Sequence, residues 1–328
     1  MSRPLAGVMA PAVTPFDADG AIARDAFAHN VRAHVAAGLS GVIVAGSSGE
    51  AALLDEGERA MLLAEARAVV PADRWLIAGI GGESTRQVIQ RARVAADAGA
   101  DAVLVVSPHY YGKRMSEGAL EAHFGAVADA SPLPVLLYNI PVYAHLVLAP
   151  ALVGRLARHG NVVGMKDSAG DLPTLERYLD AQGDGFRVLT GHGGTFATAA
   201  RMGVSGGILA VSLFAPALTL AVWEAARAGD HAAADALQAR LVPVARDIVA
   251  AQGPAGLKAA MTMVGLAGGA PRAPLLALDE AERAAARAAL ASAPTHQDSM
   301  SAHSASPAAP RAAAPRKSAR VCTASPTA

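Results

Sequence analysis

The sequence contains a single cysteine, Cys322, among its 328 residues, and only 4% of its residues are aromatic. One cysteine excludes an intramolecular disulfide framework and any zinc or iron–sulfur site built from several cysteines. The charges balance, with 28 Lys and Arg against 28 Asp and Glu, so we expect neither a nucleic-acid nor a membrane-surface partner. The first sixteen residues are broken by Pro4, Pro11 and Pro15 and lack the apolar run of a signal peptide, which predicts a cytoplasmic protein.

The longest uncharged stretch runs from Met202 to Trp223. Its length approaches that of a membrane-spanning helix, but a Gly-Gly pair and Pro216 interrupt it. We therefore expect a buried strand, a loop and the start of a helix here, and no membrane span.

The composition changes sharply near residue 292. Residues 292–328 are mainly Ala, Ser, Pro, Thr, His and Arg without aliphatic periodicity, so this tail is predicted to be disordered. A weak contact with anions is the one function considered for it. Residues 1–225 are predicted to form the main domain, and residues 226–291 to add Ala-rich helices as a C-terminal extension.

Short apolar runs alternate with longer amphipathic segments in the main domain. Continuous apolar strands that alternate with helices indicate a parallel sheet covered on both faces. Eight such units in about 225 residues predict an α/β fold of the TIM barrel, or (β/α)8, type, with a doubly wound open sheet as the alternative. The predicted strands are Gly7–Val13, Gly41–Ala45, Trp75–Ile80, Ala102–Val106, Val135–Tyr138, Val162–Met165, Arg187–Leu189 and Gly207–Val211. The predicted helices include Arg24–Ala37, Gly57–Val70, Thr85–Ala98, Glu117–Ala130, Ala149–His159 and Leu172–Ala181.

Polar side chains at the carboxyl ends of barrel strands are the candidates for chemistry. Lys166 follows an apolar strand, and burial of an unpaired ammonium is unfavourable, so such a site favours the neutral amine that forms a Schiff base with a keto group. Tyr138 ends the preceding strand, and adjacent strands would place its phenol beside this amine as a proton relay. The alternative is a lysine that pairs with Asp167 or caps its strand.

Two glycine-containing loops also follow predicted strands. The first, Gly46-Ser-Ser-Gly-Glu50, is expected to open a helix and to offer backbone N–H groups and two hydroxyls to a carboxylate. Glu50 is expected to support the first helical turn. In the second, Gly191-His-Gly-Gly194, the glycines are expected to clear space for a small keto acid.

The remaining candidates are weaker. His109 and His192 would suit a zinc-type aldolase, but no cluster of His and carboxylate residues supports them, so no metal and no cofactor are expected. Lys113 and Arg114, in a loop after the fourth strand, are candidates together with Tyr143 and His192 for recognising a second substrate.

Several motifs in order resemble the dihydrodipicolinate synthase / N-acetylneuraminate lyase family of pyruvate-linked class I aldolases, over roughly residues 4–291. The matching motifs are Thr14-Pro-Phe16, Gly46-Ser-Ser-Gly-Glu50, Tyr110-Tyr111, Tyr138-Asn139 with Pro141, and Gly164-Met-Lys-Asp-Ser168.

The resemblance implies a role for each matching residue. Lys166 would be the Schiff-base lysine, Tyr138 the proton-shuttling phenol and Ser47 its partner in the relay. Ser48, with the neighbouring N–H of Gly49, would bind the carboxylate of the keto acid, pyruvate, and the backbone carbonyl of Leu209 would face it. Tyr111 would enter the site of a neighbouring subunit, which implies a homotetramer built from dimers.

Some stretches are most similar to 4-hydroxy-2-oxoglutarate aldolase, which yields pyruvate and glyoxylate. They are Ser107–Ser116, Asn161–Ser168, Pro254–Lys258 and Ala273–Leu275.

One departure affects the substrate assignment. Dihydrodipicolinate synthases usually carry an arginine two residues after the proline of the Tyr-Asn-X-Pro motif, and this sequence has Tyr143 there. The acceptor pocket also differs from the 4-hydroxy-2-oxoglutarate aldolase pattern, so the lyase assignment is independent of the substrate assignment. The expected function is a class I carbon–carbon lyase, and the similar stretches make 4-hydroxy-2-oxoglutarate the first candidate substrate. The alternatives are 4-hydroxy-tetrahydrodipicolinate synthase, a dehydratase acting on a keto-sugar acid, and a keto-acid sensor without catalysis.

Overall fold

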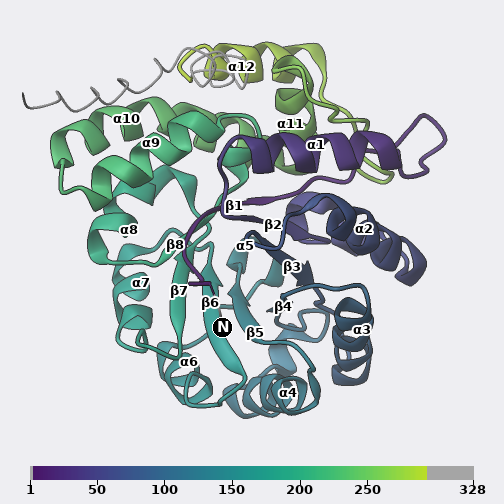
Figure 1. The fold of residues 1–328 in the computed structure, drawn as a ribbon, viewed down its shortest axis with the longest axis vertical. Helices are drawn as coiled ribbons and strands as arrows, with labels where there is room; N and C mark the ends of the chain where they lie inside the picture. The colour runs from purple at the N-terminus through teal and green to yellow at the C-terminus, as the bar shows by residue number, and fades with distance from the viewer. Residues whose placement is uncertain (1–2, 294–328) are drawn as a thin grey trace, which may run out of the picture.

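The computed structural model describes residues 3–293, and these contain a closed barrel of eight parallel strands (Figure 1). Each strand pairs with the next in the sequence, and β1 pairs with β8, which closes the barrel and rules out the open-sheet alternative. The predicted (β/α)8 barrel is therefore confirmed. The strands are β1 (Gly7–Pro11), β2 (Gly41–Val44), β3 (Trp75–Gly79), β4 (Ala102–Val106), β5 (Val135–Asn139), β6 (Val162–Asp167), β7 (Arg187–Thr190) and β8 (Gly206–Ile208).

The strands are buried on both faces, which explains their continuous apolar sequences. One set of side chains fills the barrel interior, and it includes Met9, Ile43, Ile77, Leu104 and Ile208. The alternating set points outward and forms a second cluster with the surrounding helices. Because successive side chains of a strand face opposite sides, one apolar run supplies both clusters.

Four of the helices around the barrel begin at residues whose side chains cap them. Asp55 and Glu58 form a capping box at the start of α2, and Ser84, Ser116 and Asp171 cap α3, α4 and α7. The helices are α1 (Arg24–Ala36), α2 (Glu56–Val69), α3 (Thr85–Asp97), α4 (Glu117–Ala130), α5 (Pro141–Ala144), α6 (Pro150–Leu156), α7 (Leu172–Leu179) and α8 (Phe196–Met202).

The uncharged stretch from Met202 to Trp223 divides as expected. It contains the end of α8, strand β8, a 3₁₀ turn at Ala210–Leu213 and the beginning of α9 (Pro216–Arg227). Strand β8 is shorter than predicted, since residues after Ile208 leave the sheet. None of the helices within residues 3–293 is long and apolar enough to cross a membrane.

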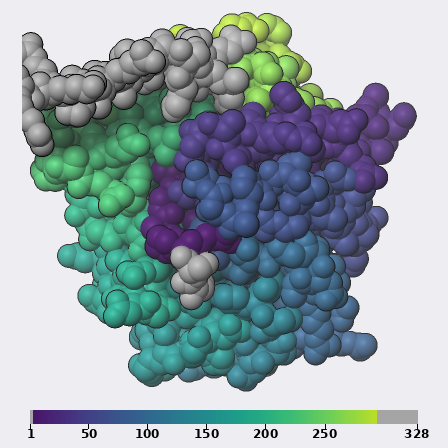
Figure 2. Space-filling model, in the orientation of Figure 1, coloured from purple at the N-terminus to yellow at the C-terminus, as the bar shows by residue number. Residues whose placement is uncertain are grey.

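The chain continues beyond the barrel as helices α10 (His231–Val244), α11 (Ala251–Met263) and α12 (Glu280–Leu290), with a π-helical turn at Ala245–Ala250. These helices lie beside α9 and α1 at one end of the molecule (Figures 1 and 2). The loop after α11 is joined to α1 by two hydrogen bonds between the Asn30 side-chain amide and the backbone of Ala267, of 2.7 and 3.0 Å. The predicted tail from residue 294 onward, including Cys322, lies outside the described residues.

Candidate active site

Lys166 and Tyr138 meet at the carboxyl ends of β6 and β5. The two residues are register partners, and the Lys166 Nζ donates a hydrogen bond of 3.1 Å to the Tyr138 hydroxyl. Nζ also lies 4.3 Å from the centroid of the Tyr138 ring. Both residues are buried, at 6% and 4% exposure. The expected pairing of amine and phenol is therefore present in a site shielded from water.

A bulge in β6 turns Lys166 toward the barrel interior. The register shifts between Val135 and Leu136 of β5, whose partners are Val162 and Gly164, so β6 carries one extra residue at this point. Since a one-residue shift exchanges the two faces of a strand, an unbulged β6 would direct the lysine toward the helices.

Asp167 does not pair with the lysine beside it in sequence. Its Oδ1 accepts hydrogen bonds from the side-chain amide of Asn139 (2.7 Å) and from the backbone N–H of Ala169 (3.3 Å). Burial raises the pKa of Asp167, and the bond from Asn139 opposes that shift. The carboxylate thus connects the end of β6 to the end of β5. The alternative expectation, an ion pair between Lys166 and Asp167, is therefore wrong.

Gly191 provides the space that Lys166 occupies. A Cβ at this position would lie only 2.7 Å from the Lys166 Cε, and it would also collide with the Ser168 hydroxyl. The cleared space is therefore next to the Lys166 side chain. His192, the next residue, contacts Thr195 through its Nδ1 at 3.0 Å, and burial lowers its pKa.

The loop with Ser47 and Ser48 differs from its prediction. It forms a 3₁₀ turn, Ser47–Gly49, and α2 begins only at Glu56, so no α-helix starts at these hydroxyls. Both serines are half-buried. Glu50 does not support a helical turn as expected, because its buried side chain forms an ion pair with Lys258 of α11.

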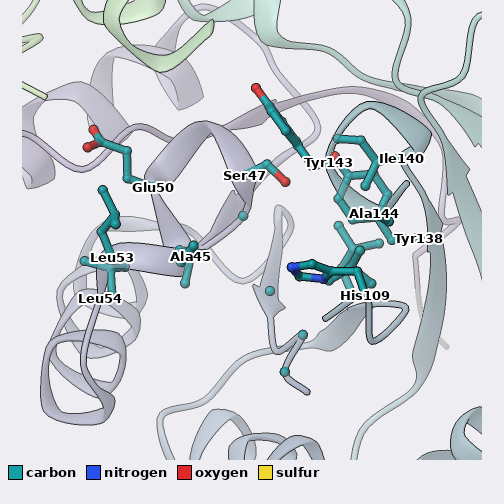
Figure 3. Close-up of a pocket in the computed structure, with 18 of the residues that line it drawn as sticks. Ala45, Ser47, Glu50, Leu53, Leu54, His109, Tyr138, Ile140, Tyr143 and Ala144 are labelled. Atoms are coloured by element: carbon teal, nitrogen blue, oxygen red, sulfur yellow. The ribbon is translucent and has the colours of Figure 1, made fainter. Parts of the chain in front are cut away.

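A cavity of about 570 Å³ opens beside Ser47 and Tyr138 (Figure 3). Tyr143, on α5, lines the same cavity, and burial together with the nearby Tyr138 raises its pKa. The cavity also reaches Arg59 and Arg91. Desolvation and the charge of Arg91 lower the pKa of Arg59 to about 10, so the Arg59 guanidinium remains cationic at neutral pH. Neither arginine is distinguished in the sequence, since each lies in an ordinary amphipathic helix pattern.

Other predicted residues lie outside this centre or have other partners. Tyr111 is 67% exposed and stacks edge-on against Tyr110, while Lys113 and Arg114 are exposed in a 3₁₀ turn beside them. The Leu209 carbonyl, expected to face the keto acid, accepts hydrogen bonds from the backbone N–H (3.1 Å) and the hydroxyl (2.7 Å) of Ser212.

The two histidines that were candidates for metal binding have different partners. His109 pairs with Glu83 through its Nδ1 at 3.0 Å, whereas His192 contacts Thr195. Residues 3–293 contain no group of three or more His, Cys, Asp or Glu side chains arranged to hold a metal ion.

Fold and site together define a class of protein: a (β/α)8 barrel with a buried lysine and a phenol at neighbouring strand ends, as in Schiff-base aldolases. The chain matches the model of the Dihydrodipicolinate synthetase family over residues 4–293, and it belongs to that family. It is therefore an enzyme, a carbon–carbon lyase of the class I pyruvate aldolase type.

Three relatives illustrate the similarity. The 4-hydroxy-tetrahydrodipicolinate synthase of Exiguobacterium sp. (strain ATCC BAA-1283 / AT1b) is 34% identical over 270 residues, 82% of this chain and 92% of the relative. Dihydrodipicolinate synthase DapA-2 of Bacillus anthracis superposes with a TM-score of 0.85 at 31% identity, covering 89% and 99% of the two chains. The chloride-inhibited dihydrodipicolinate synthase of Acinetobacter baumannii, complexed with pyruvate, gives a TM-score of 0.84 at 30% identity, covering 88% and 99%.

These relatives carry the synthase name. They support the family identified from the motifs, but not the closer likeness to 4-hydroxy-2-oxoglutarate aldolase.

Proposed function

We propose that this enzyme condenses the Lys166 amine with pyruvate and then makes or breaks a carbon–carbon bond at the methyl carbon of the bound keto acid. The observation that carries the proposal is the 3.1 Å contact between the Lys166 Nζ and the Tyr138 hydroxyl inside the barrel mouth. A pyruvate complex of a family member at 30% identity supports the choice of keto acid.

The chemistry follows from these two groups. The neutral amine attacks the keto carbon to form a carbinolamine, which loses water and becomes a protonated imine. The protonated imine withdraws electrons, so in synthesis the adjacent carbon loses a proton to give an enamine, which attacks the aldehyde. In cleavage the carbon–carbon bond breaks, the aldehyde leaves, and the same enamine remains on Lys166. Tyr138 is positioned to carry the protons, with Ser47 on the same cavity wall as its partner.

Ser48 and the N–H of Gly49 are assigned to the pyruvate carboxylate. They belong to the 3₁₀ turn that also contains Ser47, in which the Gly49 N–H donates to the Gly46 carbonyl at 3.0 Å. The carboxylate would therefore share this N–H with the carbonyl, and the Ser48 hydroxyl would be its main donor. Gly191 is assigned an indirect role, because the space that it leaves is occupied by the Lys166 side chain and not by the keto acid itself.

The names of the relatives favour a synthase reaction, in which the aldehyde is aspartate-semialdehyde. A second candidate is cleavage of 4-hydroxy-2-oxoglutarate, because one observation weighs against the synthase reaction. Tyr143 lines the cavity where synthases usually place an arginine, and its raised pKa keeps the phenol neutral, so it offers no charge to the carboxylate of aspartate-semialdehyde.

Exposed Tyr111 supports a shared site between subunits. A large aromatic side chain at 67% exposure, in edge-on contact with an exposed neighbour, is suited to burial against a second copy of the chain. We assign Tyr111 to the site of that second copy and the complete enzyme to a homotetramer. Light scattering of the purified protein tests the assembly, and a monomer would contradict it.

The test of the chemistry is reductive trapping. The enzyme is incubated with pyruvate, reduced with borohydride and digested, and the adduct is located by mass spectrometry. We expect the adduct on Lys166. An adduct on another lysine, or none, would reject the mechanism. Turnover with pyruvate plus aspartate-semialdehyde, measured beside cleavage of 4-hydroxy-2-oxoglutarate, then distinguishes the two candidate reactions.

A further inference from the structure

Glu50 connects the serine loop to the C-terminal extension. It directly follows the turn Ser47–Gly49 and adopts a left-handed backbone conformation, with φ of 57°. Its side chain is fully buried, as is that of Lys258 on α11, and the two form an ion pair. A buried charge without this partner would be strongly unfavourable, so the position of one residue constrains the other.

The ion pair belongs to a larger charged cluster. The backbone N–H of Arg272 donates to the Glu50 Oε2 at 2.8 Å, and the Lys258 Nζ donates to the Ala270 carbonyl at 2.7 Å. Both cations lie against the ring of Phe16, at 4.3 Å for Lys258 and 4.0 Å for Arg272. Burial lowers the pKa of Lys258, whereas Glu50 favours its charged form.

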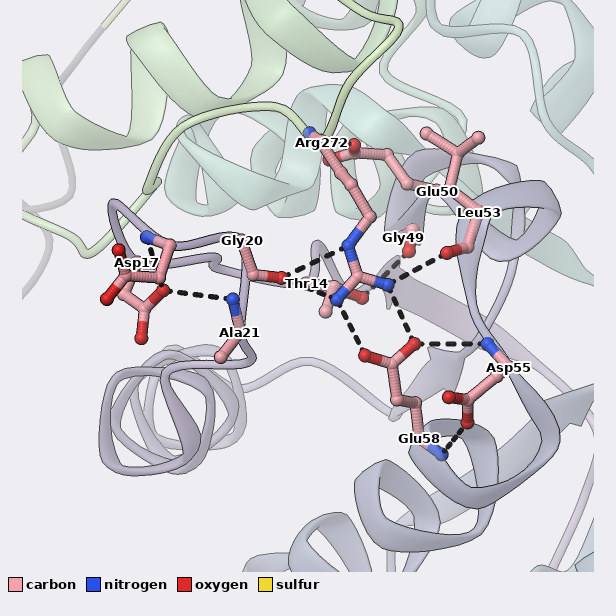
Figure 4. Close-up of polar contacts among 11 residues, drawn as sticks. Thr14, Asp17, Gly20, Ala21, Gly49, Glu50, Leu53, Asp55, Glu58 and Arg272 are labelled. Atoms are coloured by element: carbon pink, nitrogen blue, oxygen red, sulfur yellow. Dashed lines mark hydrogen bonds and ion pairs between the residues drawn. The ribbon is translucent and has the colours of Figure 1, made fainter.

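Arg272 attaches the same segment to α2. Its guanidinium binds the Glu58 carboxylate through two nitrogens, at 2.7 and 2.6 Å, and also donates to the carbonyls of Leu53 and Gly20 (Figure 4). Arg272 is thus fixed by contacts with α2 and with two backbone carbonyls. Its backbone N–H is therefore held in place as a donor to Glu50.

The other side of the turn is held by the barrel. The buried hydroxyl of Thr14, just after β1, donates to the Gly49 carbonyl at 2.7 Å. A Cβ on Gly49 would lie 2.8 Å from the Ala12 carbonyl, so the turn is in close contact with this segment. The serine loop therefore lies between the end of β1 and the C-terminal extension, with α11 in direct contact with the turn.

We propose that the Glu50–Lys258 ion pair is a positioning device, through which the C-terminal extension sets the affinity of Ser48 and Gly49 for the keto-acid carboxylate. Glu50 and Lys258 are positioning residues and take no part in the bond changes. This inference rests on the proposed function, because it takes the pyruvate carboxylate as the group that the loop binds.

Stability alone does not account for this pair. Replacing a buried ion pair with uncharged side chains of similar volume is often neutral or stabilising, whereas removing one partner leaves a buried charge and is destabilising. The single and the double substitution therefore differ in stability, and both lose the connection between loop and extension.

The experiment measures reductive trapping of Lys166 over a range of pyruvate concentrations, together with thermal unfolding. It compares the wild type with Lys258→Met and with the double variant Glu50→Gln/Lys258→Met. The control is Arg246→Gln, which removes an exposed ion pair with Asp247 on the same extension. We expect Lys258→Met to lower the unfolding temperature and to raise the half-saturating pyruvate concentration about tenfold, as when one charge-assisted hydrogen bond is lost.

The double variant separates positioning from stability. We expect its unfolding temperature to return toward the wild-type value, while its half-saturating pyruvate concentration stays about tenfold raised and adducts at saturation remain on Lys166. Recovery of both quantities would show a purely structural role and overturn the inference, as would unchanged half-saturation in both variants. A wild type without a Lys166 adduct would overturn the proposed function itself. If Lys258→Met does not fold, the half-saturating pyruvate concentration of the double variant, which has no unpaired buried charge, still distinguishes positioning from a purely structural role.

Discussion

Replacing Gly191 with alanine tests whether the observed position of Lys166 is the reactive one. The new Cβ would lie 2.7 Å from the Lys166 Cε, whereas non-bonded carbons pack no closer than about 3.5 Å. The side chain would therefore have to move by about 0.8 Å, and a displacement near 1 Å in a reacting group lowers the rate about 100-fold. The φ of Gly191 is not positive, so alanine fits the backbone and the effect is local to the side chains.

The assay is the initial rate of pyruvate adduct formation on Lys166, measured by borohydride reduction and mass spectrometry. We expect a fall of about 100-fold for Gly191→Ala and a loss of about 1–3 kcal/mol in unfolding free energy from overpacking. The matched control is Gly160→Ala, where an added Cβ meets no atom within 4 Å. A folded Gly191→Ala variant that forms the adduct at the wild-type rate would refute the reasoning.

Three further predictions concern groups around the same centre. Tyr138→Phe removes the proton relay, so turnover should fall by about 10²–10⁴-fold, and a rate within a factor of ten of the wild type would exclude that role. Arg272→Lys keeps the charge but loses the two-nitrogen contact with Glu58, so urea unfolding should show a loss of about 1–3 kcal/mol, and an unchanged midpoint would contradict this. Burial raises the folded-state pKa of Asp167 above the ordinary 3.8, so the native state binds more protons and the wild type should lose stability as pH rises from 3.8 through the raised value. Urea unfolding across this range should show that slope reduced in Asp167→Asn, and identical slopes would count against the assigned pKa.

Much of the barrel and its central pair could be predicted from local sequence. Apolar runs of strand length between amphipathic segments identify eight strands, because a parallel sheet buried on both faces has no polar side. Sequential strand order then places the end of β5 beside the end of β6, which is how the contact of Tyr138 with Lys166 could be expected before any coordinates.

The bulge in β6 could not be predicted in this way. An apolar strand with one extra residue has the same composition as a regular strand, and only pairing with β5 shows that Lys166 faces the interior. The sequence likewise does not distinguish the short turn at Ser47 from the start of a helix, since serine and glycine occur at both.

The partners of Glu50 could not be predicted from the sequence for a different reason. Glu50 and Arg272 are 222 positions apart, and a periodicity or a motif gives no information about contacts at that separation. A glutamate after a turn is typical of a solvent-exposed or capping position, and only the fold brings Glu50 against Lys258 and the backbone N–H of Arg272.

The extension reaches the second substrate's side of the site as well as the serine loop. Pro254, Pro274 and Leu275 line the cavity together with Tyr143. The backbone of α11 is kinked at Gly253, whose φ of 53° favours glycine, and a Cβ there would lie 3.5 Å from the Tyr143 hydroxyl. One structural unit therefore contacts both the loop assigned to the keto acid and the phenol that replaces the usual arginine. In the proposed mechanism the barrel supplies the lysine and the proton relay, and we expect the choice of aldehyde to depend on contacts between segments far apart in the chain. Substitutions of Pro254, Pro274 or Leu275 should consequently alter substrate preference, measured as turnover with different aldehydes, while reductive trapping of pyruvate on Lys166 stays at the wild-type level.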